Sequence, residues 1–114
     1  MAAKYSFKHQ EEEIIVNEGE SDEQRFVLFE MKASARGAYI DQARTRIDAQ
    51  NRVSKMNGVE SELLCKCLRT LDGKLVEAKV IQEWPGGLVA DLYTRAQILN
   101  RLDGKSPAQE LKNE

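Results

Sequence analysis

The stretch from Leu88 to Gly104 constrains the fold of this chain more than any other segment. Its apolar residues recur at steps of three and four, which is the spacing of an amphipathic helix. The stripe consists of Leu88, Leu92, Ala96 and Leu99, widened by Ile98 and Leu102. Gly104 follows the last periodic residue, where a left-handed helix cap is expected. We therefore expect one long helix here, with other segments of the chain packed against its apolar stripe.

Composition limits the size and surroundings of the core. With 114 residues, a single domain spanning residues 1–114 is expected. Apolar residues make up 41% of the chain and charged residues 32%, whereas aromatic residues make up only 6%. These values predict a modest, mainly aliphatic core beneath a heavily charged surface.

The charge and hydropathy patterns bear on partners and location. A net charge of −2 gives no overall cationic field of the kind that nucleic-acid binding normally needs. No apolar run approaches the roughly 20 residues that span a bilayer, and the N-terminus lacks the apolar region of a signal peptide. We expect a cytoplasmic protein with neither a nucleic acid nor a membrane as its partner.

Residues 1–32 carry the strand signals. A β-branched run at 14–16 follows three glutamates, a polar loop spans residues 17–24, and a second apolar run covers residues 25–31. Tyr5 and Phe7 alternate with polar neighbours and give a further, weaker strand signal. We expect an N-terminal β-hairpin that packs on the helices, because an isolated hairpin is only marginally stable.

A second amphipathic pattern runs from Ala35 to about Val53, with Ser34 as its N-cap. Its apolar positions are Tyr39, Ile40, Ala43 and Ile47. The arginines of this segment can be read as a nucleic-acid stripe. The aspartates between them favour a solvated outer face with internal ion pairs instead.

A further helix is predicted from about Val59 to Leu71, between an Asn57-Gly58 turn and a stop at Asp72-Gly73. Residues 74–83 fit a strand or a helix, and we prefer a short helix over about 77–84 that ends before Pro85.

The predicted elements add up to a mainly α (α+β) fold. It has about four helices in a body covering residues 33–104, an N-terminal β-hairpin packed on that body, and a flexible polar tail over residues 105–114.

No catalytic constellation stands out in the sequence. His9 is the only histidine and is far from Cys65 and Cys67, which are two residues apart and would point to opposite sides of a helix. The cysteines are therefore interpreted as packed thiols and not as a metal or redox pair. No nucleotide-binding glycine motif is present. We expect no catalytic residues, no cofactor, no metal site and no enzymatic activity.

The order of these features resembles the small tail assembly chaperones of long-tailed bacteriophages and prophages. The segments that carry the resemblance are Leu63–Leu68 with the Asp72-Gly73 stop, Trp84-Pro85, and the closing run Leu99–Leu102. The likeness covers roughly residues 25–104. It rests on the order of helices and stops and not on an invariant motif.

The resemblance implies a mostly helical, non-catalytic protein. Members of this family bind the phage tape measure protein, a long helical polypeptide, and keep it soluble while tail tube subunits polymerise around it. They act in the cytoplasm of the bacterial host and are absent from the mature virion. Many of their genes also yield a longer product by a −1 ribosomal frameshift, whose extension is thought to contact the tape measure or the tail tube protein. Leu111-Lys112-Asn113 is compatible with such a slippery site.

A chaperone for an amphipathic helix needs an apolar groove with a charged rim. We expect that groove along the seam between the Ala35–Val53 and Leu88–Leu102 segments. Tyr39, Trp84 and Tyr93 are the candidate partner-binding residues, since aromatic anchors often dominate interfaces. For each of them the alternative interpretation is a core residue.

Two other functions remain open at this stage. One is a tail-completion or adaptor protein that stays in the particle, and the other is a small nucleic-acid-binding regulator that uses the arginines of the Ala35–Val53 segment. Self-association is also left open.

Overall fold

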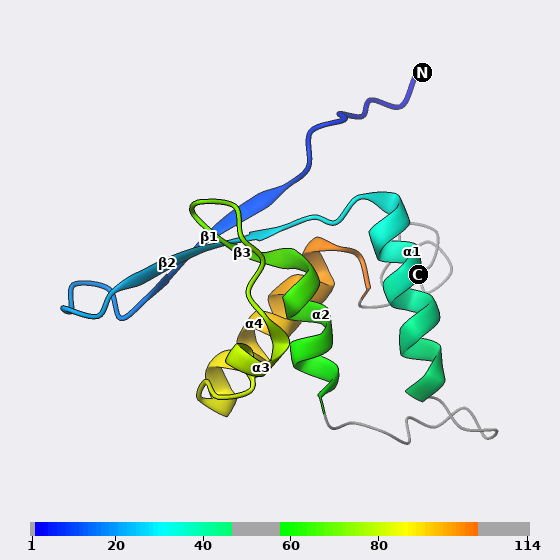
Figure 1. The fold of residues 1–114 in the computed structure, drawn as a ribbon. Helices are drawn as coiled ribbons and strands as arrows, with labels where there is room; N and C mark the ends of the chain where they lie inside the picture. The colour runs from blue at the N-terminus through cyan, green and yellow to red at the C-terminus, as the bar shows by residue number, and fades with distance from the viewer. Residues whose placement is uncertain (1, 47–57, 103–114) are drawn as a thin grey trace, which may run out of the picture.

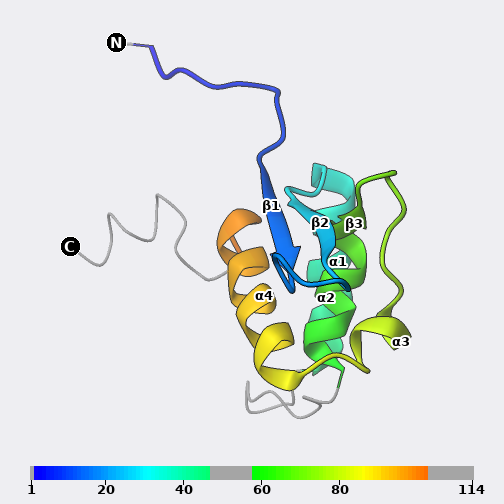
Figure 2. The same ribbon diagram turned by 90° about the vertical axis from the view of Figure 1, so that its left-hand side faces the viewer.

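A three-stranded antiparallel sheet lies across one side of four α-helices (Figures 1 and 2). The computed structural model describes residues 2–46 and 58–102. The elements in chain order are β1 (Glu11–Val16), β2 (Gln24–Phe29), α1 (Ala33–Ala43), a short 3-10 helix η1 (Arg44–Arg46), α2 (Val59–Cys67), β3 (Leu68–Thr70), α3 (Ala78–Ile81) and α4 (Gly86–Leu99). The predicted α+β class, with an N-terminal hairpin on a helical body, is confirmed.

The hairpin pairs β1 with β2 in an antiparallel register that sets Glu11 opposite Phe29 and Val16 opposite Gln24. Its turn contains two residues in the left-handed region, Asn17 (φ 57°) and Gly19 (φ 81°). The predicted polar loop is therefore the hairpin turn. Residues 2–10, by contrast, form no strand. The weak strand signal from Tyr5 and Phe7 was therefore wrong for a single copy of the chain.

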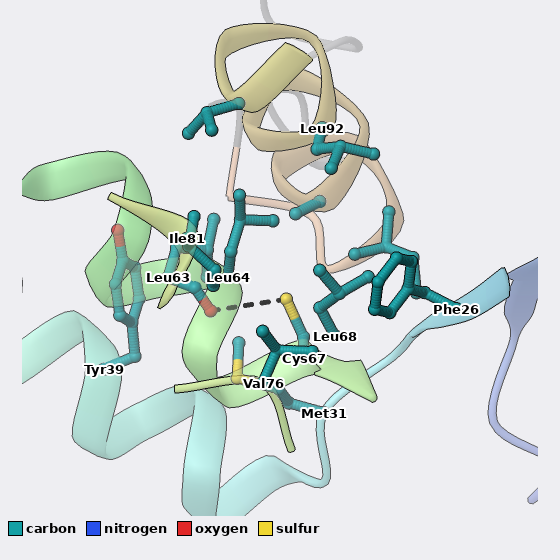
Figure 3. Packing of buried hydrophobic residues seen from close by; sticks show 13 residues of the cluster. Phe26, Met31, Tyr39, Leu63, Leu64, Cys67, Leu68, Val76, Ile81 and Leu92 are labelled. Carbon is teal, nitrogen blue, oxygen red and sulfur yellow. Dashed lines mark hydrogen bonds between the residues drawn. The ribbon is translucent and has the colours of Figure 1, made fainter. Parts of the chain in front are cut away.

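The sheet and α4 bury their apolar faces against α2, which lies in the middle of the core (Figures 1 and 3). The four-residue stripe predicted for α4 is confirmed: Leu92 and Ala96 are buried, and Leu88 and Leu99 pack at the edge of the core. The predicted widening by Ile98 is wrong, because that side chain is 59% exposed. α4 ends at Leu99, and Gly104 lies outside the described residues. The most deeply buried apolar side chains are Leu28, Leu63, Leu64, Cys67, Leu68 and Ile81.

The predicted helix over Val59–Leu71 is wrong at its C-terminal end. α2 stops at Cys67, and the chain continues as β3, which sets Leu68 opposite Leu28 and completes the sheet beside β2. Leu68 fits the apolar spacing of the predicted helix. An extended backbone also buries it, and only that backbone lets the segment hydrogen-bond to β2. Leu71, expected on the apolar face, is 60% exposed.

The Asp72-Gly73 stop is a turn after β3 and not a helix cap. The Gly73 N–H donates to Thr70 O at 3.0 Å, and Gly73 has φ +93°. The chain then doubles back, so that the Thr70 N–H donates to Lys74 O at 2.8 Å and Leu75 bridges to Arg69. Both a helix cap and this turn need a left-handed glycine, which explains the misinterpretation.

The predicted N-cap of α1 is also wrong. The helix begins at Ala33 with Lys32 as its cap residue, and the Arg36 N–H donates to Lys32 O at 3.0 Å. Ser34 therefore lies inside the first turn. The helix is followed to η1, and the expected continuation to Val53 lies outside the described residues.

The segment between Gly73 and Pro85 combines both predicted alternatives. Leu75 pairs with β3, whereas Ala78–Ile81 forms the short helix α3 inside the expected 77–84 range. The helical body predicted over 33–104 also contains β3, which belongs to the same sheet as the hairpin. The predicted tail over 105–114 lies outside the described residues. Within residues 2–46 and 58–102, no helix has the length and apolar character needed to cross a membrane.

Candidate interaction site

An apolar hollow of about 500 Å³ opens between the hairpin and the junction of α3 with α4. The hairpin contributes the end of β1 and the start of β2, and the junction contributes the Trp-Pro break and the first turn of α4. The residues that line it are Ile15, Val16, Asn17, Gln24, Phe26, Trp84, Pro85 and Leu88. Six of these eight side chains are apolar, which is unusual on a chain in which 32% of residues are charged.

Trp84 gives the hollow a rigid wall. Its ring packs on the Phe26 ring with centroids 5.4 Å apart and an interplanar angle of 53°. The Trp84 backbone N–H donates to Ile81 O at 3.0 Å, which continues the turn at the end of α3. Pro85 then ends that segment, and α4 begins directly after it. Because the Trp84 and Phe26 rings pack on each other within one chain, the hollow exists without a partner.

The hairpin beside the hollow is strongly acidic. Between Glu11 and Arg25 the sequence has seven carboxylates and one arginine. Arg25 contacts Glu13 at 3.0 Å and Glu23 at 3.1 Å. The Gly19 N–H and the Arg25 guanidinium hold the pKa of Glu23 below its usual value. The apolar hollow therefore borders a surface of negative charge.

Arg95 connects this hairpin to α4. Its guanidinium contacts Glu12 on β1 at 2.6 Å and Asp91 one turn earlier on α4 at 3.2 Å. The Asp91–Arg95 pair joins residues four apart on one helix, and Glu12 extends it to the sheet. Hydrogen bonds to Asp91 and the nearby Glu12 charge raise the pKa of Arg95. All three side chains are exposed enough for water to weaken the attraction.

The three predicted partner-binding residues are not brought together at this site. Trp84 alone among them lines the hollow. Tyr39 is 6% exposed and belongs to the core on α1. Tyr93 is half-buried on α4, where its hydroxyl accepts a hydrogen bond from Gln97 Nε2 at 3.2 Å.

The expected seam between the Ala35–Val53 segment and α4 also differs from the structure. α2 contacts both α1 and α4, and it lies between them in Figure 1. The open apolar surface is instead at the hairpin side of α4. Sequence reasoning missed it because Ile15, Val16 and Phe26 are brought to Trp84 only by the tertiary fold.

Asn100 is a structurally important residue that the sequence analysis also missed. It is 2% exposed, and its Oδ1 accepts from the Met31 N–H at 2.6 Å while its Nδ2 donates to Ala96 O at 3.0 Å. Arg36 donates to the Asn100 and Arg101 carbonyls, both at 2.8 Å. These bonds fasten the end of α4 to the connection between β2 and α1. The sequence does contain a signal for this residue. Asn100 lies four residues after Ala96, so the helical period places a polar side chain on the apolar face of α4.

The cysteines behave as packed thiols. The Cys67 thiol donates to Leu63 O at 3.4 Å, and its burial raises its pKa to about 12. Cys65 is half-buried, with a pKa that burial also raises. His9 Nδ1 lies 3.0 Å from Glu30 O. Over residues 2–46 and 58–102, no three histidine, cysteine or acidic side chains are grouped so that they could hold a metal ion.

No family model, curated protein or solved structure matches this chain. The geometry of the hollow is therefore the main basis for inferring a function.

Proposed function

We propose that this chain is a non-catalytic tail assembly chaperone that binds the tape measure protein of a long-tailed phage or prophage. It acts in the cytoplasm of the bacterial host, holds the tape measure in solution while the tail tube assembles, and is left out of the mature virion. The tail tube protein is a second candidate contact.

The observation that carries the proposal is the preformed apolar hollow beside Trp84. A helical client can insert one large apolar side chain into such a site while its own apolar stripe lies along the surrounding surface. The hollow keeps its shape because Trp84 and Phe26 pack on each other, so a client would pay little to organise it. The acidic hairpin favours a client whose apolar stripe is flanked by lysine or arginine.

The direct test is co-expression of this chain with the tape measure protein of the phage or prophage that encodes it. Replacing Trp84 by alanine removes the wall of the hollow, so client affinity should fall about tenfold or more and the soluble fraction of tape measure should fall with it. The matched control is Val80→Ala. Val80 is 44% exposed on α3 and does not line the hollow, so this variant should bind normally.

Thermal melting of the chain alone separates binding from folding in this experiment. The proposal requires Trp84→Ala to remain folded at the assay temperature and still bind weakly. Equal binding by Trp84→Ala and Val80→Ala would assign the client to another surface.

Tyr93 tests whether the client extends along α4 beyond the hollow. In that case Tyr93→Ala should weaken binding more than it lowers the melting temperature, and Tyr93→Phe should bind almost normally because the ring is kept. Unchanged binding with a large loss of stability would make Tyr93 a core residue only.

Two observations on the native locus separate the chaperone from a structural tail protein. Mass spectrometry of purified particles should not detect this chain, whereas an adaptor or tail-completion protein would be present. An intact-mass profile should also show a minor longer product that shares this N-terminus and diverges near Lys112-Asn113.

A further inference from the structure

The first residues of the chain form an arm that leaves the domain with its aromatic rings in water. Tyr5 is 95% exposed and Phe7 is 104% exposed, the two highest values among the large apolar residues that the structure describes. The arm also carries Lys4 and Lys8 and has no acidic residue before Glu11. It alternates in the manner of a strand, yet residues 2–10 pair with no strand of residues 11–46 or 58–102.

The sheet offers an open edge for such a strand. β1 is the outermost strand in the order β1-β2-β3, and no other strand of the described residues pairs with its outer side. The Glu30 N–H donates to Gln10 O at 2.8 Å, so the alternation of an antiparallel ladder turns the backbone groups of Glu11, Glu13 and Ile15 outward. Figure 2 shows this edge of the sheet beside α4.

We propose that the arm of one copy adds as an antiparallel strand to the outer edge of β1 in a second copy, and that the exchange is reciprocal. A two-fold axis near Gln10 would relate the copies, which is the closed arrangement expected of a dimer. Main-chain hydrogen bonds would join the strands, as in other cases of strand addition.

A two-fold axis normal to the sheet keeps each residue on its own face, and residues directly opposite in an antiparallel pair share one face. With Gln10 opposite Gln10 of the other copy, Tyr5 falls opposite Ile15 and Phe7 falls opposite Glu13. Both aromatic rings would then lie on the face of the sheet that carries Ile15, beside the end of β1 that borders the hollow.

The same register brings unlike charges together. Lys8 falls opposite Glu12 of the other copy. The arm has two lysines and no carboxylate, whereas the hairpin from Glu11 to Arg25 has seven carboxylates and one arginine. This charge complementarity favours the arm over an acidic segment as the occupant of the edge.

A second copy fits better than the arm's own chain. The arm leaves from the end of β1 that is farther from the hollow, and the six residues of β1 span about 20 Å. At that end, His9 Nδ1 lies 3.0 Å from Glu30 O and the Gln10 N–H donates to Glu30 Oε1 at 3.1 Å. These contacts continue the line of β1, and Figure 1 shows the arm leaving β1 on the side opposite to the hairpin turn. The hollow lies at the turn end of β1, so the arm points away from it. A two-fold rotation reverses β1 and brings the arm to the hollow of the other copy.

The first test is sedimentation of the full chain alone over a range of concentrations. We expect a reversible dimer, and we expect Phe7→Ser to raise its dissociation constant about tenfold to a hundredfold because one aromatic side chain loses its burial. The control is Leu71→Ser, which removes an exposed apolar side chain from a site away from β1 and should leave the dimer unchanged. A monomer at every concentration, or a dimer indifferent to Phe7→Ser, would overturn the proposal.

The second test fixes the register by a disulfide. Ser6 and Ile14 would form a non-hydrogen-bonded pair, whose Cα separation of about 4.5 Å suits a disulfide. The variant Ser6→Cys/Ile14→Cys should oxidise to a covalent dimer with a peptide linking positions 6 and 14, whereas Ser6→Cys/Val80→Cys should not. A 6–14 link within one chain, seen at monomer mass, would refute exchange between copies.

The self-association does not depend on the chaperone function, because both tests use this chain without a client. Loss of tape measure binding in Trp84→Ala with an intact dimer would support the function alone. A dimer in a chain that binds no tape measure would support the exchange alone.

Discussion

The core around α2 and the hairpin side of this molecule differ in the contacts that stabilise them. Around α2, apolar side chains are fully enclosed, with Leu63, Leu64 and Cys67 all at 0% exposure. On the outer side of the hairpin, an ion pair between exposed side chains joins β1 to α4, and an apolar hollow remains open. Enclosed apolar contacts contribute far more to folding than exposed ion pairs do. Stability should therefore reside around α2, while the hairpin side is free to bind.

The largest effect should come from the centre of the core. Replacing Leu64 by alanine removes a fully enclosed side chain, so the free energy of unfolding should fall by about 3 kcal/mol. Leu71→Ala is the control, and a change within about 0.5 kcal/mol is expected because Leu71 is exposed. Urea denaturation measures both. Similar losses in the two variants would remove the distinction between the two sides.

The next effect concerns the polar anchor at the end of α4. Asn100→Ala leaves the buried Met31 N–H without its acceptor at 2.6 Å, so unfolding should become easier by about 2 kcal/mol. Gln97→Ala is the control on the same helix, since it removes a hydrogen bond to Tyr93 only at the partly buried surface. Urea denaturation of both variants is the measurement. Equal losses would show that the anchor matters no more than an ordinary helix-surface contact.

Alkaline pH should weaken the core through Cys67. Its pKa is raised from 9.0 to about 12, so above pH 9 the unfolded chain loses this proton while the folded chain keeps it. Stability from this thiol is complete below pH 9 and is lost as the pH rises toward 12, by at most about 1.4 kcal/mol per pH unit.

Unfolding free energies at several pH values between 8 and 10.5, compared with those of Cys67→Ala, isolate this contribution. The variant should show a shallower decline than the native chain. Parallel declines would mean that Cys67 ionises equally in the folded and unfolded chains.

The smallest effect should come from the hairpin side. Arg95→Ala removes the contacts to Glu12 and Asp91, but these groups are exposed, so only a slight fall in melting temperature is expected. Salt near 1 M should abolish the difference from the native chain, because screening at that concentration acts within about 3 Å. A large, salt-independent loss would place the hairpin connection among the main stabilising contacts.

The contrast between the two sides also explains what the sequence could predict. The period of α4 was clear because Leu88, Leu92 and Ala96 face one continuous core, and such a stripe depends only on local spacing. The hairpin was likewise predicted from two apolar runs around a polar turn. Features that local spacing determines were found from the sequence.

Features that depend on distant segments were missed. Leu68 continues the helical pattern of α2, yet Leu28 lies across from it and the chain becomes strand β3. The hollow needs Phe26 and Trp84 to meet from segments far apart in the sequence. The residue spacing around Phe26 or around Trp84 does not indicate that the two rings are in contact.

The length of α4 sets the two ends of the molecule apart. Its first turn borders the hollow, and its last turn is fastened by Asn100 and Arg36 beside the start of α1. Fourteen helical residues correspond to about 21 Å. α4 therefore acts as a rigid spacer between the hollow and the anchor that Asn100 and Arg36 form. A client side chain in the hollow and this anchor would lie about two nanometres apart.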